Sequence, residues 1–388
     1  MPSDNPIHTT TKTAWETTKG MFQELKKQGI ARYTILKTFL WFTAAMLVLG
    51  IYYYYRYQMR KERLDLKNMS SALASVPITL TGMDGSNGNN QYKLRDYYIA
   101  SSYNSCCPGD FLDDYVSLEA LRNVIKRGVR FLDFEIYSYK GEAVVAASPI
   151  QNFHFKGTYN SIPVGEVFQA INSYALSSAC PNPKDPLFIH LRIKSNNIDI
   201  YKKITKALTS NFNNLLAQTS AEFADESHGE NITNKPILDF RGKICLICDH
   251  PTKNFRGTSL EELINLVSGG NFVRGLREHN VEFSSDMDEL MEHNKKNMSI
   301  VLPDLNSIDT NQNAALQQKY GCQFTCMNYQ KMDANLDYYL KFFASSAFVL
   351  KPANLRYQPT TIKKPPPQDP SLSYAPRSIS MPQFQGNI

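Results

Sequence analysis

The hydrophobic pattern divides the chain into regions of different character. Residues 1–37 are polar and mixed in charge, whereas residues 38–55 form an uncharged run of 18 residues, TFLWFTAAMLVLGIYYYY. Between about 93 and 356, short apolar runs alternate with segments whose apolar residues recur at helical spacing. This pattern predicts strands at 131–137, 187–193 and 244–247, and helices at 116–126, 164–174, 198–208 and 259–267.

Strands that alternate with helices over this length indicate an α/β fold. A stretch of about 260 residues is the size of a TIM-like (β/α)8 barrel. The remaining boundaries follow from composition. Residues 56–92 are predicted to be a juxtamembrane segment and a Gly/Asn/Ser-rich approach loop, and residues 93–356 the barrel. Residues 357–388 are rich in Pro, Ser and Gln and are predicted to be a disordered tail, with binding of a protein partner as a lesser possibility.

The uncharged run at 38–55 is just long enough to span a hydrocarbon core. Trp41 and the four tyrosines at 52–55 suit the membrane interfaces. A cleaved signal peptide is disfavoured because the polar leader is too long and no small-residue cleavage site follows. A buried core helix is the remaining alternative. We therefore expect a single-pass membrane protein, with its barrel preceded by one transmembrane helix. Five basic residues flank the run on each side, so its orientation is not predicted.

Charge and cysteine usage add little to this picture. The 388-residue chain has a net charge of +6 without a long basic block, which is compatible with an anionic membrane surface and predicts no nucleic-acid partner. The seven cysteines follow no disulfide or zinc pattern. Cys245 and Cys248 have CxxC spacing, but they lie in a segment that is typical of a buried strand.

Several stretches, in order and spacing, resemble the catalytic X and Y halves of eukaryotic-type phosphoinositide-specific phospholipase C. The X half is represented by DYYIASSYNS, LEALRNVIKRGVRFLDFEIY, VFQAINSYAL, DPLFIHLRI and DFRGKICLI. The Y half is represented by VEFSSDMDELMEHNKKNMSIVLPD, GCQFTCMNYQ and FVLKPANLR. The resemblance implies a TIM-like barrel with its site at the carboxyl ends of the strands. In that family two histidines and a calcium ion, bound by an Asn and three carboxylates, drive cleavage of the phosphodiester.

The calcium-ligand positions implied by the resemblance are Asn104, Asp133, Glu135 and Arg192. Asp133 and Glu135 are two residues apart on a predicted strand, so they share one face and need a positive partner, which is either a metal or a side chain. Arg192 stands where the family has its fourth carboxylate, and a guanidinium repels a divalent metal. We therefore expect Arg192 to pair with Asp133 and Glu135 in place of calcium. No cofactor is expected, or calcium if the protein is active.

The two histidine positions implied by the resemblance hold Tyr103 and Ala147. Neither side chain exchanges protons near pH 7 as an imidazole does. His154 and His190 are the candidate substitutes, although His154 is otherwise expected to be solvated in a loop and His190 to be satisfied in the core. Ser284 (or Ser285) is a candidate for phosphate contact, with ordinary turn chemistry as the alternative, and Ser307 lies near the position of the family's head-group arginine.

These substitutions predict a membrane-anchored phospholipase C-like protein with lost or strongly reduced phosphodiesterase activity. We expect it to interact with the lipid bilayer, with anionic phospholipid head groups or with a protein. The alternative is a divergent, active phosphodiesterase that cleaves inositol phospholipids or related phosphodiesters. In that case Asp133, Glu135 and Asn104 would have new roles, with His154 or His190 as the base.

Overall fold

A computed structural model describes residues 15–23, 30–150, 155–217, 231–249, 255–305, 310–359, 378–381 and 384–387. Its centre is a nearly closed barrel of parallel strands in the order β7-β6-β5-β2-β1-β10-β9-β8. In chain order these strands are β1 (Tyr97–Ser102), β2 (Phe131–Tyr139), β5 (Leu187–Lys194), β6 (Ile244–Asp249), β7 (Leu266–Ser268), β8 (Val273–Arg277), β9 (Met298–Leu302) and β10 (Phe324–Met327). The expected α/β barrel is therefore observed.

The barrel strands are buried on both faces, which explains their nearly continuous apolar sequences. Every residue of β1, β5, β9 and β10 is buried. Three short strands extend the sheet outside the barrel path. β3 (Glu142–Ala146) pairs with β2, β4 (Ile162–Pro163) pairs with β3, and β11 (Phe348–Leu350) pairs with β1.

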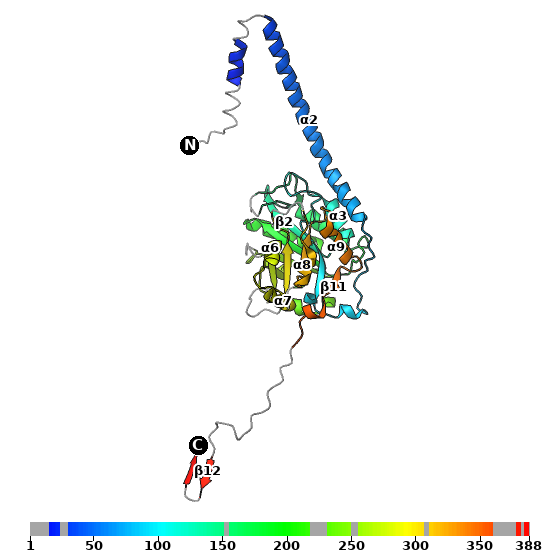
Figure 1. Ribbon diagram of the computed structural model, residues 1–388, viewed down its shortest axis with the longest axis vertical. Helices are drawn as coiled ribbons and strands as arrows, with labels where there is room; N and C mark the ends of the chain where they lie inside the picture. The colour runs from blue at the N-terminus through cyan, green and yellow to red at the C-terminus, as the bar shows by residue number, and fades with distance from the viewer. Residues whose placement is uncertain are drawn as a thin grey trace.

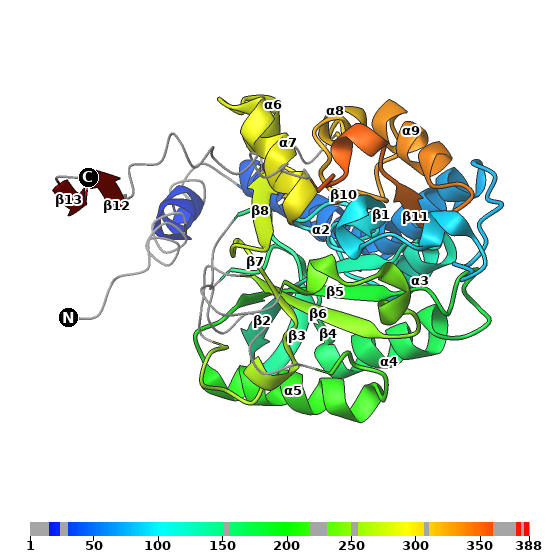
Figure 2. The same ribbon diagram turned by 90° about the horizontal axis from the view of Figure 1, so that it is seen from below.

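Helices cover the outside of the barrel, as Figure 2 shows. They are α3 (Leu118–Lys126), α4 (Val164–Ala175), α5 (Ile198–Asn211), α6 (Glu278–Glu282), α7 (Met287–Lys296), α8 (Ala314–Lys319) and α9 (Ala334–Phe342). Most begin at a side chain that accepts a hydrogen bond from the first turn; these capping residues are Ser117, Asn197, Asp286, Asn313 and Asp333.

The predicted strands at 131–137, 187–193 and 244–247 are confirmed, as are the helices at 116–126, 164–174 and 198–208. The helix predicted at 259–267 is wrong. The segment forms one 3-10 turn, Glu261–Leu263, and then β7. The Asn265 side chain accepts a hydrogen bond from the Leu246 backbone at 2.8 Å, and β7 pairs with β6. Pairing with the sheet therefore overrides the helical spacing of the apolar residues.

Helix α2 (Ile30–Ala74) is 45 residues long and extends away from the barrel (Figure 1). It is longer than the uncharged run at 38–55, and it includes residues 56–74 of the predicted juxtamembrane segment and approach loop. Among the described residues, α2 is the one helix that is long and apolar enough to cross a membrane. Trp41, Phe42 and Tyr53 are 70%, 65% and 68% exposed, so this apolar stretch is not the core helix of the barrel.

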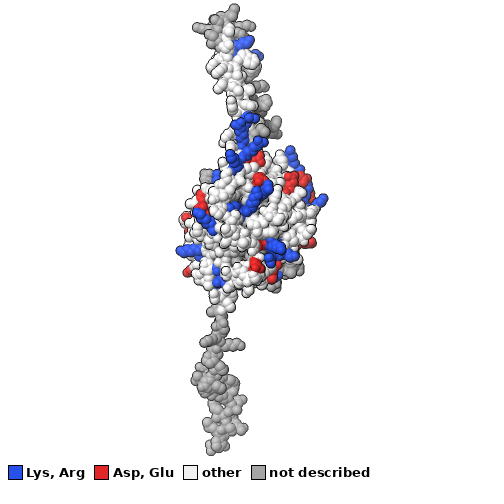
Figure 3. Space-filling model, turned by 90° about the vertical axis from the view of Figure 1, so that its right-hand side faces the viewer, with Lys and Arg blue, Asp and Glu red and all other residues white. Residues whose placement is uncertain are grey.

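The carboxyl-terminal part of α2 packs against the barrel. Met69 and Leu73 are buried in the main hydrophobic core, and the Arg127 guanidinium donates to the Val76 carbonyl oxygen at 2.8 Å. Closer to the apolar stretch, the Lys61 ammonium lies 3.1 Å from Asp114. Figure 3 shows basic side chains gathered where α2 meets the barrel. The helix is thus joined to the barrel by both packing and charge.

The described part of the tail differs from the prediction of disorder for 357–388. Strands β12 (Ser378–Met381) and β13 (Phe384–Asn387) pair with each other in an antiparallel hairpin. Residues 360–377, which include most of the proline-rich stretch, lie outside the described residues.

Candidate functional site: a salt-bridged cluster in the barrel

The register of β2 and β5 brings the candidate residues together inside the barrel. Asp133 pairs with His190 and Glu135 pairs with Arg192 across these parallel strands. Alternation sends all four side chains to the same face of the sheet. Beneath them, three aromatic rings close the barrel. The Phe131 and Phe324 rings are 4.6 Å apart and the Phe188 and Phe324 rings 5.4 Å apart. The polar cluster therefore lies above an apolar floor, toward the carboxyl ends of the strands.

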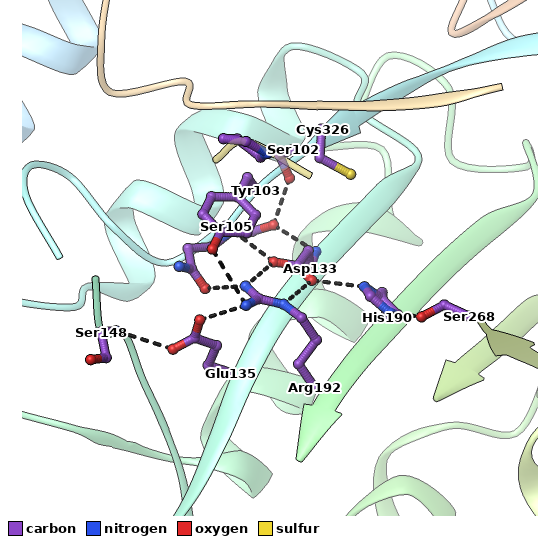
Figure 4. Close-up of polar contacts among 12 residues, drawn as sticks. Ser102, Tyr103, Ser105, Asp133, Glu135, Ser148, His190, Arg192, Ser268 and Cys326 are labelled. Carbon is purple, nitrogen blue, oxygen red and sulfur yellow. Dashed lines mark hydrogen bonds and ion pairs between the residues drawn. The ribbon is translucent and has the colours of Figure 1, made fainter. Parts of the chain in front are cut away.

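Arg192 lies at the centre of this cluster, between Asp133 and Glu135 (Figure 4). Its Nε and Nη2 atoms donate to the two Asp133 carboxylate oxygens at 2.8 and 2.6 Å. Nη1 donates to Glu135 Oε1 at 2.5 Å, and Nη2 also donates to Asn104 Oδ1 at 2.8 Å. One guanidinium thus binds three residues that the resemblance associates with calcium. The planar fork of arginine suits this bidentate contact.

The remaining acceptor sites of Asp133 are also occupied. His190 Nδ1 donates to Oδ1 at 2.8 Å, and the Asn104 backbone N–H donates to Oδ2 at 3.0 Å. Burial alone would raise the pKa of Asp133. The charge of Arg192 and the hydrogen bonds from His190 and Arg192 overcome that effect and hold the pKa well below its usual range. Asp133 therefore stays ionised although it is fully buried.

Glu135 and Asn104 complete the cluster. Glu135 Oε2 accepts from the Tyr137 hydroxyl at 2.7 Å and from the Ser148 backbone N–H at 3.1 Å. Asn104 follows the end of β1 in the left-handed region, with φ of 41°, which asparagine tolerates better than most residues. This conformation lets Asn104 present its backbone N–H to Asp133 and its side-chain oxygen to Arg192.

The residues present do not fit a calcium ion. Calcium takes six to eight oxygen ligands, and here the oxygens of Asn104, Asp133 and Glu135 converge on a guanidinium. A divalent ion among them would meet a fixed positive charge and no free carboxylate oxygen. Within the described part of the chain, no group of three His, Cys, Asp or Glu residues is arranged to hold a metal.

Tyr103, which the resemblance aligns with the first family histidine, covers the guanidinium. The Arg192 Cζ atom lies 4.5 Å from the centre of the Tyr103 ring, and Arg192 Nη1 donates weakly to the Tyr103 hydroxyl at 3.4 Å. Burial raises the pKa of Tyr103, so the phenol stays protonated. Ala147, which the resemblance aligns with the second family histidine, is buried, and its carbonyl oxygen accepts from the Gly157 and Thr158 N–H groups. Neither residue supplies a proton carrier.

His190 links Asp133 to a residue that the sequence did not indicate. Its Nδ1 contacts Asp133 at 2.8 Å, and its Nε2 lies 3.1 Å from the Ser268 hydroxyl. Ser268 in turn lies 3.2 Å from Asp249 Oδ1. Because Asp133 only accepts, Nδ1 carries a proton. The single Ser268 proton then has two acceptors, His190 Nε2 and Asp249 Oδ1. His190 is fully buried, which agrees with the expectation of a satisfied core histidine.

Of the remaining candidates, Ser284 is described, and it is not part of the cluster. His154 and Ser307 fall outside the described residues. Ser284 follows α6, and its hydroxyl donates to the Asp286 carbonyl oxygen at 3.2 Å, which is ordinary turn chemistry. Sequence reasoning missed Ser268, Tyr137 and the Ser148 N–H. The alternation of β2 could have indicated Tyr137, which lies two residues beyond Glu135.

Comparison with known proteins agrees with this fold. Residues 90–248 match the family model of the phosphatidylinositol-specific phospholipase C X domain. PLC21 of S. officinalis has a TM-score of 0.57 and 18% identity. PLC21 of L. pealei has a TM-score of 0.56 and 20% identity. Both alignments cover 70% of this chain and 38% of the other. No curated protein sequence is detectably similar to the chain.

The structural likeness defines a fold class: the barrel has a phospholipase C-like fold. The X-domain match covers β1 to β6, and the chain spans well under half the length of the two PLC21 proteins. A calcium-dependent phosphoinositol-specific phospholipase C from Pseudomonas is less similar, with a TM-score of 0.42 and 10% identity over 65% of this chain and 96% of that one. The resemblance of the later strands to the Y half stays a prediction.

Proposed function

We propose that this chain is a membrane-anchored, phospholipase C-like protein that binds lipid or protein and does not cleave phosphodiesters by the family's route. The observation that carries the proposal is the Arg192 guanidinium bound to Asn104, Asp133 and Glu135. A built-in positive charge satisfies the carboxylates permanently. A divalent ion would have to displace the Arg192 side chain, which donates five hydrogen bonds.

The expected loss of rate is large. Removal of one general acid or base lowers a rate by roughly 10²–10⁴, and residues that act as a unit do not combine additively. Because Arg192 occupies the oxygens of Asn104, Asp133 and Glu135, a further Lewis-acid contribution of several kcal/mol from a divalent ion is not expected at these residues. Tyr103 and Ala147 offer no substitute proton carrier, and His190 already uses both ring nitrogens inside the barrel.

Membrane anchoring through α2 is the second part of the proposal. Its apolar stretch is exposed over more than four helical turns, and an exposed apolar surface of this size needs a non-aqueous environment. The tyrosines at 52–55 and the basic residues Arg56, Arg60 and Arg63 follow one another along α2, as at the end of a membrane span. The helix then continues without a break into the segment that packs on the barrel.

The test uses the full chain reconstituted in vesicles that contain phosphatidylinositol or its 4,5-bisphosphate, with and without calcium. Water-soluble products are quantified for the wild type, for Asp133→Asn and for vesicles without protein. We expect the three to be indistinguishable. Calcium-dependent turnover that Asp133→Asn abolishes would refute the loss of activity and would leave membrane anchoring unaffected.

A divergent phosphodiesterase is the second candidate, and the chain of contacts from Asp133 through His190 to Ser268 favours it. In this reading His190 takes a proton from Ser268 or from a water molecule in its place, and Asp133 orients the imidazole. The same vesicle assay discriminates. Turnover that is independent of calcium, and is lost in both His190→Gln and Ser268→Ala, would establish this candidate.

A further inference from the structure

A polar cavity lies at the carboxyl ends of β2 and β5, and it shares only Tyr137 with the cluster around Arg192. Its volume is about 370 Å³, and it is lined by residues 137–139 at the end of β2, by residues 194–197 at the end of β5 and by Lys156. Among the described residues, the lining contains two ammonium groups, three side chains with hydroxyl groups or amides from each strand end, and no carboxylate. Its composition favours an anion that accepts several hydrogen bonds.

The two lysines are held in place. Lys194 is 5% exposed at the end of β5, beside Tyr137 in the register with β2. The Lys156 ammonium donates to the carbonyl oxygens of Thr158 and Tyr159 at 2.6 and 3.0 Å. Carbonyl dipoles orient this ammonium without neutralising it. Burial lowers the pKa of both lysines, so an anion that offset their desolvation would be bound favourably.

Charged side chains near the cavity act on Lys194 in opposite directions. Arg192 and Arg277 oppose the charge of Lys194, whereas Glu135 and Asp249 favour it. Glu135 is already paired with Arg192. At the rim, the Lys140 and Lys156 ammonium groups lie 5.3 and 5.5 Å from the centre of the Tyr139 ring, which adds positive charge at the opening. Counted over the described residues, the local charge is positive.

The position of the cavity relates it to α2. The loop that holds Lys156 continues to Tyr159, whose hydroxyl accepts from Gln58 at 2.9 Å and lies 3.4 Å from the Tyr54 hydroxyl. Tyr54 is the penultimate residue of the uncharged run, and Gln58 follows it by one helical turn. The mouth of the barrel thus meets α2 where this helix leaves the apolar stretch, and Figure 1 shows that stretch rising beyond the barrel.

We propose that this cavity binds a phosphate group through Lys156 and Lys194, and that in the membrane this group belongs to a phospholipid head group. The phosphate has the several acceptor oxygens that the lining requires, and lysine is a common point-charge ligand for it. The lipid source rests on the proposed anchoring of α2. A soluble phosphate ester offers the same chemistry without a membrane.

The experiment uses the full chain in an uncharged detergent, with three probes. These are inorganic phosphate, dihexanoyl phosphatidic acid as a monomer, and dihexanoyl phosphatidylcholine as the zwitterionic reference. Binding is measured by titration calorimetry for the wild type and for Lys194→Gln, Lys156→Gln and Asn196→Asp. The control is Lys206→Gln, on the exposed face of α5. All four variants change the net charge by −1, so a non-specific charge effect would appear equally in each.

We expect phosphatidic acid to bind at least tenfold more weakly to each cavity variant, because one charge-assisted contact is lost or opposed, and normally to Lys206→Gln. Asn196→Asp keeps the side-chain shape at an exposed position, so it tests the site even where loss of buried Lys194 disturbs folding. Binding of inorganic phosphate alone, weakened by the same variants, would retain the site and assign it to a soluble ligand.

Two results would overturn the site itself. One is equal weakening in Lys206→Gln, which would indicate general attraction between charges. The other is no binding of either phosphate probe by the folded wild type. Neither result depends on the phosphodiesterase assay, so the failure of this inference and the failure of the proposed loss of activity are distinguishable.

Discussion

Removal of Arg192 tests the electrostatic argument most directly. Arg192→Met leaves Asp133 and Glu135 buried, ionised and without their counter-charge. Loss of one partner of a buried, hydrogen-bonded pair costs about 3–5 kcal/mol. For a domain of this size, each kcal/mol corresponds to about 2–4 °C, so the melting temperature should fall by about 6–20 °C. Circular dichroism of the full chain in an uncharged detergent measures this change.

A matched control is present on the surface. Arg274 forms a bidentate pair with Glu289 at 2.8 and 2.5 Å, but both side chains are partly exposed. Arg274→Met should therefore cost at most about 1 kcal/mol. The triple variant Arg192→Met, Asp133→Asn, Glu135→Gln removes the uncompensated charge as well. It should recover much of the stability, because a neutral buried cluster is less costly than an unpaired one.

The same melting experiment in the presence of calcium tests whether the guanidinium takes the place of a metal ion. With the guanidinium gone, the oxygens of Asn104, Asp133 and Glu135 face one another without a cation. Calcium should then raise the melting temperature of Arg192→Met and leave that of the wild type unchanged. The reasoning is refuted if the wild type is stabilised by calcium at these residues, or if Arg192→Met costs no more than Arg274→Met.

Three further predictions concern Tyr103, Asp65 and Lys351. Tyr103→Leu should destabilise the barrel by about 2 kcal/mol because it removes the ring from the buried Arg192 guanidinium, whereas Tyr103→Phe keeps the ring and should cost little; urea unfolding compares them. Burial, and then the charge of Asp114, raises the pKa of Asp65 to about 6 from 3.8. The favourable contribution of the protonated carboxyl to the stability of the fold is therefore complete below pH 3.8 and is lost as the pH rises through 6. Asp65→Asn should thus raise the free energy of unfolding at pH 8 by about 1 kcal/mol, after allowance for the partial exposure of Asp65, and should have no such effect near pH 4. Burial lowers the pKa of Lys351 to about 7 from 10.5, so the unfolded chain binds more protons in that window and stability should increase as the pH rises from 7 to 10. In Lys351→Met this increase should be absent, and its persistence would contradict the assignment.

The sequence was sufficient for the core of the site because strand alternation is a short-range rule. It placed Asp133 with Glu135 on one strand and His190 with Arg192 on another, and the polar residues in apolar strands required partners. The fold resemblance then made the two strands neighbours. The register that places Glu135 opposite Arg192 is set only when the two strands pair in the sheet.

The missed features depend on contacts between distant segments. Ser268 lies in a strand of three residues, inside a segment whose apolar spacing indicated a helix, and it contacts a histidine 78 positions away. The length of α2 was underestimated because charged residues after Tyr55 end the hydrophobic run. They do not end the helix, whose later residues Met69 and Leu73 are covered by the barrel.

Continuity between α2 and the barrel changes what affinity the cavity needs. A flexible tether would allow the mouth to face any direction, whereas α2 is one helix whose end is fixed to the barrel by Leu73, Arg127 and Lys61. A site held at a bilayer meets head groups at an effective concentration in the millimolar range or above. Weak binding to a soluble phosphate probe is then compatible with high occupancy in the membrane. The same rigidity makes the docking contacts a determinant of occupancy: variants that loosen Lys61 from Asp114 should reduce lipid binding in vesicles without changing the affinity for soluble phosphate.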